Sequence, residues 1–596
     1  MTTPPDCQSI WVVDFEFTSN PGDRPNPVCV VAHELKSGKT ESVWLDGEDA
    51  GDLKSPPYST GKDALFISFY APAEMSCHLA LGWQMPANLV DLFAEHRVQT
   101  NGLPGVGNSL IAACEYRGVP SIPSSDHKDK MRELILAGGP YSENNRQSIL
   151  EYCAEDVRLT KDLFLKMQRA IDWPRALFRG MYQESLSLVE HRGIPIDTET
   201  LGRLRQHWQG LKARLVKEID AEYNVYDGLT FKTAEFERYL SQKDIPWPRT
   251  ETGRISLSDE VFKDMSKTYP FLQGLKDLRH LLGAMKLSPQ KHDARLPRKK
   301  GLSVGSDGRN RTMLSPFRSK TGRNQPSSAE YIFGPAVWLR SLIKPEPGKA
   351  LIYADYSQQE FAIAGYLSGD TTMQAAYATT DPYLSFAKMA GAAPQDATKE
   401  SHKAVRDLYK ICALGVQFGM RAQSLARQMN RPPAYAEELL RQHRRVFKKY
   451  WDWSDGVLNS ALLTRRMTTS FGWQLHITGD GGDAERSIRN WPMQSTGSDI
   501  LRMASVLLER NGLEIVGPVH DAVLLECSVD DADNVAKKAV AVMEQASSYV
   551  LGEQRIVRVD YEIIRHPDRY SDPRGVETWN RVTRLLDEMD AEAGTP

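Results

Sequence analysis

Short apolar runs and helical repeats alternate along the N-terminal part of the chain. The stretches IWVVDFEF (10–17), PVCVVAHEL (27–35) and ALFISF (64–69) have the length and content of buried strands. The segment 145–167 instead repeats its apolar positions with the helical period. Because strands and helices interleave, we predict an α/β domain over residues 1–175.

The pattern changes after this domain. Residues 176–320 are predicted to be mostly helical, with the clearest amphipathic segments at 184–193, 200–220 and 271–287. Strands and long helices are mixed again over residues 321–596. The expected fold class is therefore a multidomain α/β protein with a helical middle region.

A basic window lies between Lys286 and Arg323. It holds eleven Lys or Arg residues and two acids, with Gly, Ser and Pro throughout. Most charge runs of this kind are solvated loops, although a surface that contacts phosphates needs the same residues. The window taken alone favours the solvated loop.

Composition restricts the class of protein. At 596 residues the chain is too long for one core, and its net charge of −3 argues against a simple basic coat protein. Seven scattered cysteines without a CxxC pair favour reduced thiols over a zinc or disulfide framework. The sequence has no signal peptide and no apolar run long enough to span a membrane. We expect a cytoplasmic monomer that does not bind membranes.

Two acids interrupt the first apolar strand. Asp14 and Glu16 are two residues apart, so both side chains point to one face, where they repel unless cations lie between them. In ILEYCAEDVRL, Tyr152 and Asp156 are four apart and share one face of a helix. An edge strand with a solvated polar face would explain the first pair alone, and the second pair weakens that explanation.

The order of D-x-E, a distant acid and Y-x-x-x-D resembles the proofreading 3′–5′ exonucleases of the DEDD type, tyrosine subclass. The resemblance implies an RNase H-like domain in which four acids hold two divalent ions, Mg²⁺ or Mn²⁺, and a tyrosine positions the attacking water. The matching metal ligands are Asp14, Glu16 and Asp156, and the matching tyrosine is Tyr152.

The sequence offers two candidates for the fourth acid of this site. The family usually carries an Asn and an Asp four residues apart, and FYAPAEMSC offers Tyr70 and Glu74 at that spacing. We therefore expect Glu74 to be the ligand. Asp91 is its competitor, although its position is more typical of the start of a helix.

A single charge ends the apolar run Leu351–Ala354. Asp355 stands there in ALIYADYSQQEF, and a carboxylate is costly to bury unless it is paired or holds a metal. In GPVHDAVLLE one strand ends and another begins at His520 and Asp521, which predicts a hairpin with an acid at its tip.

Two helical stripes are candidates for ligand contact. One stripe runs from cationic to apolar, which suits a triphosphate at one end and a sugar and base at the other; it consists of Arg406, Lys410, Leu414 and Phe418. A snorkelling amphipathic helix explains the spacing but not this gradient. A second, polar stripe could contact the minor groove of a duplex, and it consists of Arg486, Asn490 and Gln494.

The motif DYSQQE closely resembles motif A of the family A DNA polymerases, whose usual form is DYSQIE. The likeness continues in register through TGR (321–323), RDLYKICALGVQFGM, ERSIRNWPMQST and VHDAVLLE. It implies a right-hand polymerase with the thumb and basic linker over 176–320, and palm and fingers over 321–596 (fingers about 370–470). Its partners would be primer–template DNA and dNTPs, and its cofactor two Mg²⁺ per site, with Mn²⁺ as an alternative.

The resemblance also implies roles for single residues. Asp355 and Asp521 would hold the ions, together with the backbone carbonyl of Tyr356. Glu360 resembles the steric gate that excludes a ribose 2′-hydroxyl. The expected nucleotide contacts are Arg406, Lys410, Leu414, Phe418, Glu360, Gln359 and His520, with Lys410 also expected to be catalytic. With the polymerase motifs placed, the basic window favours phosphate contact. The expected DNA contacts are Arg323, Arg298, Lys299 and Lys300 from this window and Arg486, Asn490 and Gln494 from the polar stripe.

The chain departs from the family pattern at four positions. Gln359 replaces an aliphatic residue, Leu414 an aromatic residue, Phe418 a tyrosine and Ala522 a glutamate. These changes leave catalysis in reach and put nucleotide selectivity in doubt. The sequence starts at the exonuclease motifs, so we expect no 5′-nuclease domain and a polymerase of the phage or plasmid type.

Two other classes of protein compete with this interpretation. One is a 3′–5′ exonuclease whose polymerase half has become a non-catalytic DNA-binding module, which the intact Asp355, Arg406, Lys410 and Asp521 argue against. The other is a replication scaffold in which both groups of acids are solvated faces. Primer extension with and without Mg²⁺ separates the three.

Overall fold

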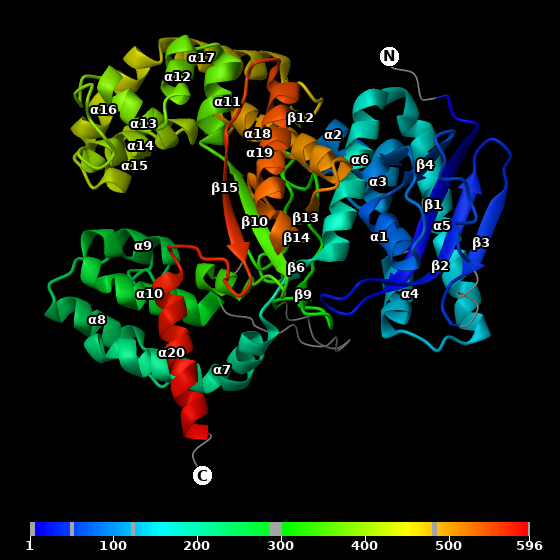
Figure 1. The fold of residues 1–596 in the computed structure, drawn as a ribbon, viewed down its shortest axis with the longest axis horizontal. Coiled ribbons are helices and arrows are strands. Elements are labelled where there is room, and N and C mark those ends of the chain that lie inside the picture. The colour runs from blue at the N-terminus through cyan, green and yellow to red at the C-terminus, as the bar shows by residue number, and fades with distance from the viewer. Residues whose placement is uncertain are drawn as a thin grey trace.

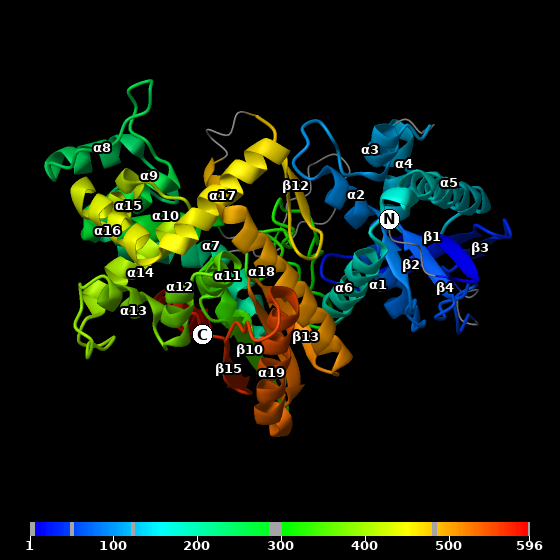
Figure 2. The same cartoon turned by 90° about the horizontal axis from the view of Figure 1, so that it is seen from above.

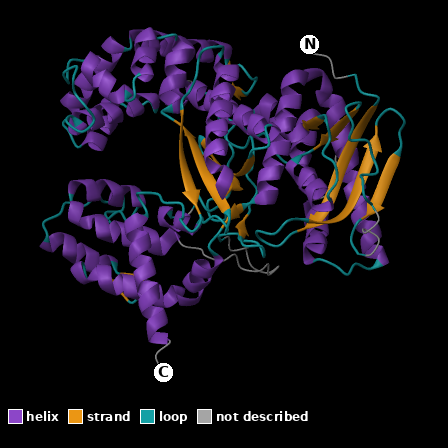
Figure 3. Ribbon diagram, in the orientation of Figure 1, coloured by secondary structure: helices purple, strands orange, loops and turns teal. Residues whose placement is uncertain are grey.

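The computed structural model describes residues 6–47, 53–120, 125–284, 301–334, 336–479 and 485–593. Figure 1 shows an N-terminal sheet with its helices at one end of the molecule and a smaller sheet at the centre. Two groups of helices lie on the other side of the central sheet, as the view from above and the ribbon coloured by secondary structure also show (Figures 2 and 3).

The N-terminal region is a five-stranded mixed sheet in the order β3-β2-β1-β4-β5. The central strand β1 pairs antiparallel with β2 and parallel with β4. These three are the predicted strands, and the structure adds the edge strands β3 and β5. The bounds are β1 Ser9–Thr18, β2 Asn26–Glu34, β3 Thr40–Trp44, β4 Ala64–Ser68 and β5 Leu89–Asp91. The predicted helix at 145–167 is α5 (Glu143–Met167), and it packs on β1 and β2.

Shorter helices complete this region, and α6 connects it to the rest of the molecule. Gly180 of α6 lies so close to β5 that an added Cβ would be 1.9 Å from the carbonyl oxygen of Leu89. One residue earlier, Arg179 forms a buried ion pair with Glu95, with N–O distances of 2.6 and 2.8 Å. The bounds are α1 Pro72–Leu81, α2 Leu92–Thr100, α3 Leu110–Arg117, α4 Ser125–Ala137 and α6 Trp173–Arg192.

The helical region after α6 has a small core of its own. Phe236, Trp247 and Phe262 are buried there and stack edge to face or face to face. The predicted amphipathic segments become parts of α6, α7 and α10; the bounds are α7 Thr198–Ile219, α8 Thr233–Gln242, α9 Asp259–Thr268 and α10 Gln273–Ala284, with a hairpin of β7 (Tyr226–Asp227) and β8 (Thr230–Phe231).

The C-terminal helix α20 (Val576–Ala593) packs against α7. Ion pairs line the contact, among them Arg203 with Asp587 at 2.6 Å and Arg584 with Glu218 at 2.9 Å. Just before α20, Arg569 donates a hydrogen bond to Asp197, the N-cap of α7, at 3.1 Å. The C-terminal segment therefore joins the central sheet to the helical region along α7.

The central sheet is antiparallel, in the order β13-β14-β10-β15. Strand β10 (Lys349–Tyr356) contains the predicted apolar run, and the predicted hairpin is formed by β13 (Glu514–Val519) and β14 (Ala522–Ser528). At the end of β10, Asp355 pairs with Ala522 on one side and with Asp560 of β15 (Val559–Arg565) on the other. The sheet packs on α19 (Ala532–Leu551), and α18 (Glu485–Arg510) packs against both α19 and β13.

The second group of helices lies between β10 and α18 in the chain. It includes the predicted nucleotide helix as α14; the bounds are α11 Gln359–Ser368, α12 Thr371–Ala378, α13 Pro382–Met389, α14 Lys403–Gln417, α15 Ala422–Met429, α16 Pro433–Val446 and α17 Lys448–Thr464. Two further small sheets pair β6 (Ile194–Pro195) with β9 (Arg309–Asn310) and β11 (Arg466–Thr468) with β12 (Gln474–His476).

The basic window is only partly described by the structure. Its members Arg298, Lys299 and Lys300 lie outside the described residues. Within the described part of the chain, no helix has both the length and the apolar character that crossing a membrane requires.

Candidate functional site: two groups of carboxylates

Three acids meet at the N-terminal sheet, and we call them, with Glu74, the N-terminal acid cluster. Asp14 and Glu16 come from β1 and Asp156 from α5, and one carboxylate oxygen of each lies within 4.8 Å of the others. The pairing of β1 with β2 shifts register directly after Glu16. Such bulges re-aim neighbouring side chains, and this one lies next to the cluster.

Burial and mutual repulsion make this cluster hard to ionise. Burial, followed by the charge of Asp156, raises the pKa of Asp14 to about 8. Burial also raises the pKa of Glu16 well above its usual value, with Asp14 as the next cause. Ionised oxygens packed this closely need cations, and all-oxygen ligand sets suit Mg²⁺ or Mn²⁺. The residues therefore fit a divalent metal.

The structure distinguishes the two candidates for the fourth acid. Asp91 is the N-cap of α2, where it accepts hydrogen bonds from the amides of Phe93 at 2.9 Å and Tyr70 at 2.8 Å. Glu74 is 2% exposed, and its Oε2 has no hydrogen-bond partner among the described residues. Burial, followed by the charge of Asp14, raises the pKa of Glu74 well above its usual value. Asp91 therefore has a structural role at the start of α2, and Glu74 as a metal ligand stays a prediction.

Tyr152 and a lysine lie over the same cluster. Tyr152 is one helical turn before Asp156 on α5, and burial, followed by the charge of Asp156, raises its pKa. The ammonium of Lys128, on α4, is 2.7 Å from Oδ1 of Asp156 and 5.6 Å from the centre of the Tyr152 ring. Sequence reasoning missed Lys128, because a lysine in a helix of mixed charge gives no signal.

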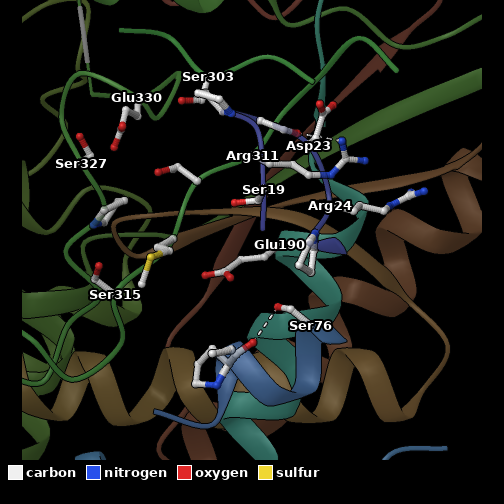
Figure 4. Close-up of a pocket in the computed structure, with 18 of the residues that line it drawn as sticks. Ser19, Asp23, Arg24, Ser76, Glu190, Ser303, Arg311, Ser315, Ser327 and Glu330 are labelled. Carbon is white, nitrogen blue, oxygen red and sulfur yellow. Dashed lines mark hydrogen bonds between the residues drawn. The ribbon is translucent and has the colours of Figure 1, made fainter. Parts of the chain in front are cut away.

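A cavity of about 550 Å³ adjoins this region (Figure 4). Its wall includes Phe17, the residue after Glu16, and the exposed side of α1, the helix that carries Glu74. Figure 4 shows the Glu190 carboxylate pointing into the cavity. Burial raises the pKa of Glu190 to about 7, and the amide of Leu314 donates to its Oε1 at 2.6 Å. The cavity thus lies between the N-terminal sheet and residues 303–330.

The second group of carboxylates lies at the end of the central sheet, and we call it the palm acid group. Asp355 ends β10, Asp521 is in the turn of the β13–β14 hairpin, and Asp560 lies opposite Asp355 on β15. Burial, followed by the charges of Asp521 and Asp560, raises the pKa of Asp355 to about 6. The Tyr356 hydroxyl donates to the carbonyl of Met543 at 2.6 Å, which leaves only its backbone carbonyl for the predicted metal contact.

Asp560 is the member of this group that sequence reasoning missed. Its signal was an acid inside the strand pattern VRVDYEII, the same kind of signal that pointed to Asp355. Ser357 donates a hydrogen bond to Asp560. The hydroxyl therefore holds the Asp560 side chain beside the end of β10.

Arg323 is the cation of the palm acid group. Its guanidinium is 2.9 Å from Oδ1 of Asp521 and 3.7 Å from Oε1 of Glu360. Burial raises the pKa of Glu360, and Arg323 lowers it. The predicted TGR segment and the predicted gate residue are thus brought together with one predicted metal ligand.

The loop that carries Arg323 is held by residues far away in the sequence. The carbonyl of Lys320 accepts hydrogen bonds from Asn101 at 2.8 Å, Trp473 at 3.1 Å and Trp491 at 2.9 Å. Gly322 has a φ of 78°, and an added Cβ would be 3.1 Å from the Trp473 ring. Asn101 ends α2, so the N-terminal region supports the arginine of the palm acid group.

The predicted stripe of cationic and apolar residues lies on α14, with Phe418 directly after the end of the helix. Arg406 is paired with Asp381 at 2.7 Å and with Asp407 at 3.1 Å. Lys410 lies 5.9 Å from the centre of the Tyr383 ring and forms no ion pair within the described part of the chain. Leu414 is half-buried, and Phe418 caps the C-terminal end of the helix. Lys410 is therefore the cation of this stripe that is free to meet a ligand.

The remaining predicted contacts differ in exposure. Arg486 and His520 are exposed, and Asn490 and Gln494 are half-buried on α18. Gln359 is 3% exposed, and an added Cβ on Gly497 of α18 would be 2.5 Å from its side-chain oxygen. Gln359 therefore packs against α18, and its role toward a nucleotide stays a prediction.

Comparison with known proteins covers much of this architecture. The model of the family described as DNA polymerase family A matches residues 199–563. The chain is similar to DNA polymerase I of Chloroflexus aurantiacus, with 26% identity over 66% of this chain and 44% of that protein. It is also similar to the thermostable DNA polymerase I of Thermus filiformis, with 25% identity over 71% of this chain and 51% of that protein. The chain thus spans about half the length of these curated relatives.

A solved structure extends the likeness of the fold. The POL domain of Pol1 from M. smegmatis, in complex with DNA primer-template and dNTP, matches with a TM-score of 0.68 and 18% identity. The match covers 92% of this chain and 94% of that chain. It therefore reaches into the N-terminal region, which lies before the residues that the family model matches.

Proposed function

The chain belongs to DNA polymerase family A, and from this premise we propose that it is a template-directed DNA polymerase that adds dNTPs to a primer 3′ end. The observation that carries the proposal is the palm acid group, in which Asp521, in the turn before β14, lies beside Asp355 at the end of the adjacent strand β10, inside the segment that matches the family. Repulsion between these acids is relieved when a cation lies between them.

Each part of the site has a place in this reaction. Asp355, Asp521 and the Tyr356 carbonyl would hold the ions. Divalent ions supply an activated primer hydroxyl and a stabilised pyrophosphate leaving group when they are bound. Lys410, which has no carboxylate partner within the described residues, meets the triphosphate, while Arg406 must exchange Asp381 for phosphate to do so.

We propose that the surroundings of the palm acid group also give selectivity for deoxyribose. Glu360 is half-buried and is held toward the acids by Arg323. A side chain fixed in that position occupies the space that a 2′-hydroxyl needs. We infer further that residues 176–320 form the thumb, and 321–596 the palm and fingers.

We also propose a second activity, 3′–5′ exonucleolytic proofreading by residues 1–175. The N-terminal acid cluster carries this proposal, because Asp14, Glu16 and Asp156 present three oxygens within 4.8 Å of one another. Tyr152 lies over them, where it can orient a water. A cavity of about 550 Å³ adjoins the cluster at Phe17, the residue after Glu16, and we propose that a single strand approaches from this side.

One pair of assays tests both activities. The parent should extend a primer only with Mg²⁺ or Mn²⁺, and Asp355→Ala should abolish extension while single-strand degradation remains. Asp14→Ala combined with Glu16→Ala should do the reverse. Each loss should be on the order of a thousandfold or more, because each change removes the ligands of an ion that stabilises the transition state.

The outcomes separate the alternatives. Degradation without extension in the parent would show a nuclease with a non-catalytic polymerase half. A variant that loses both activities while it keeps its far-UV circular dichroism and melting temperature would contradict the assignment of two sites.

A further inference from the structure

We propose that Lys128 is a built-in cation of the N-terminal acid cluster and competes with a divalent ion for Asp156. The inference rests on the proposed exonuclease function, because that function requires metal at the cluster. It adds a residue that no motif of the chain marks, and it predicts how tightly the cluster holds metal before DNA arrives.

The contact between Lys128 and the cluster is direct. The Lys128 ammonium is 2.7 Å from Oδ1 of Asp156, and the two side chains are 20% and 13% exposed. Its position 5.6 Å from the centre of the Tyr152 ring adds a cation–π contact on the same side of α5. Lys128 thus touches both residues of the Y-x-x-x-D motif.

The charge of Lys128 reaches the other acids as well. Burial is the main cause that raises the pKa of Asp14 and of Glu16, and Lys128 acts in the opposite direction on both. Among the described residues, Lys128 is the cation that lowers both pKa values. Lys128 is therefore the protein's own means of neutralising part of the cluster.

A lysine in this position opposes metal binding. A divalent ion held by Asp14, Glu16 and Asp156 lies within a few ångströms of the Asp156 oxygen that Lys128 contacts, where like charges repel strongly in a partly buried site. The ion must displace the ammonium or bind beside it at a cost. Either case lowers the metal affinity of the DNA-free protein.

DNA changes this balance. A backbone phosphate that enters the cluster offers the ammonium a second anionic partner, so that Lys128 can leave Asp156 to the metal. Metal binding and single-strand binding then favour each other, as two ligands do when each removes an obstacle to the other. The cluster is loaded most fully when a strand is present.

Manganese titration of the DNA-free protein tests the competition directly. The polymerase site is first silenced with Asp355→Ala and Asp521→Ala, and free Mn²⁺ is followed by electron paramagnetic resonance. Lys128→Met is the informative variant, because methionine keeps the aliphatic stem over the Tyr152 ring and removes the charge. Lys130→Met, an exposed position on the same helix, is the matched control.

The expected result is a Mn²⁺ affinity about tenfold higher in Lys128→Met than in the silenced parent, with no change in Lys130→Met. Unchanged affinity would overturn the proposal. Weaker affinity would also overturn it, because it would show that Lys128 orients Asp156 as a ligand instead of competing for it.

A further variant separates this proposal from the exonuclease assignment. Asp14→Ala in the silenced protein should remove the Mn²⁺ site that the titration detects. If the titration is the same with and without Asp14→Ala, the cluster binds no metal, and both the exonuclease assignment and the competition are wrong. Binding that Asp14→Ala removes, but that Lys128→Met leaves unchanged, contradicts the competition alone.

Discussion

The N-terminal acid cluster and the palm acid group gather the same chemical groups in different surroundings. In the cluster, burial raises the pKa of Asp14 to about 8, and that of Glu74 well above its usual value. In the palm acid group, burial raises the pKa of Asp355 only to about 6, and Arg323 stands 2.9 Å from Asp521. The cluster is the more strongly protonated of the two when no metal is bound.

This difference shows how the protein can give two groups of acids different properties without changing the type of side chain. Depth of burial sets how much a carboxylate resists ionisation, and the position of a fixed cation sets how much repulsion is left for a metal to relieve. Arg323 pairs with Asp521 of the palm acid group and Lys128 with Asp156 of the cluster, so the main difference between the two groups is the depth of burial. The two sites should therefore respond differently to pH.

The largest contrast is expected in metal affinity below pH 8. A metal must displace the proton that Asp14 holds up to a pH of about 8, so affinity should fall about tenfold per pH unit below that value. Between pH 8 and pH 6 the cluster should lose about a hundredfold in Mn²⁺ affinity, and the palm acid group much less. Mn²⁺ titration of Asp355→Ala measures the N-terminal acid cluster, and titration of Asp14→Ala measures the palm acid group. The same pH dependence of Mn²⁺ affinity in both variants would contradict the expected difference.

The same groups make stability depend on pH in a predictable direction. The folded protein without metal holds the Asp14 proton up to a pH of about 8, whereas the unfolded chain releases it near 3.8. Asp14 therefore destabilises the folded state increasingly as pH rises through this window, and the destabilisation is absent below it. Melting temperatures with EDTA should fall across the window more in the parent than in Asp14→Asn, and Mg²⁺ should restore the parent.

A moderate effect is expected at Glu360. Glu360→Ala removes the partner of Arg323 in the palm acid group and opens room for a 2′-hydroxyl, so discrimination against ribonucleotides should fall by about tenfold. Single-nucleotide insertion of a dNTP and the matching rNTP measures the ratio. Exonuclease activity is the internal control and should not change, and unaltered discrimination would place the gate at another residue, with Phe418 the next candidate.

The smallest effect is expected at Leu414. Leu414→Tyr adds an aromatic face to the α14 stripe, and a few tens of Å² of extra apolar contact, at about 25 cal/mol per Å², corresponds to roughly fivefold tighter nucleotide binding. The apparent KM for dNTPs should fall and the tolerance of dideoxynucleotides should shift. Steady-state extension measures both, and identical kinetics would show that this face of α14 does not meet the nucleotide.

Local spacing predicted the parts of the sites that lie on one element or on a short turn. Asp14 and Glu16 share a face because strands alternate, and the carboxylates of Asp355 and Asp521 stand at strand ends that the apolar pattern marks. Arg406 and Lys410 lie along one helix for the same reason. In these cases the period of the backbone was enough.

Long-range contacts were beyond the reach of spacing. Nothing in the sequence near Lys128 distinguishes it from Lys130, and only the packing of α4 on β1 brings it to Asp156. The support of the Arg323 loop combines Asn101 with Trp473 and Trp491, which lie more than three hundred positions from Asn101 in the sequence. Gln359 follows the predicted metal ligand Asp355 in the motif, yet its side chain packs against α18.

The C-terminal helix has a mechanical consequence. The helical region 198–284 is attached to the rest of the chain in two ways: it continues from α6, and it is contacted again by Arg569 and α20. Its movement relative to the central sheet is therefore restrained by more than its covalent link. The second attachment combines buried apolar side chains of α20, such as Val582 and Leu586, with exposed ion pairs, which are each worth at most about 1 kcal/mol and are weakened by salt. A higher ionic strength should therefore loosen this attachment. If salt shortens the lifetime of a complex with DNA, part of that effect would then come from the weakened contact between α20 and α7 and not from lost phosphate contacts.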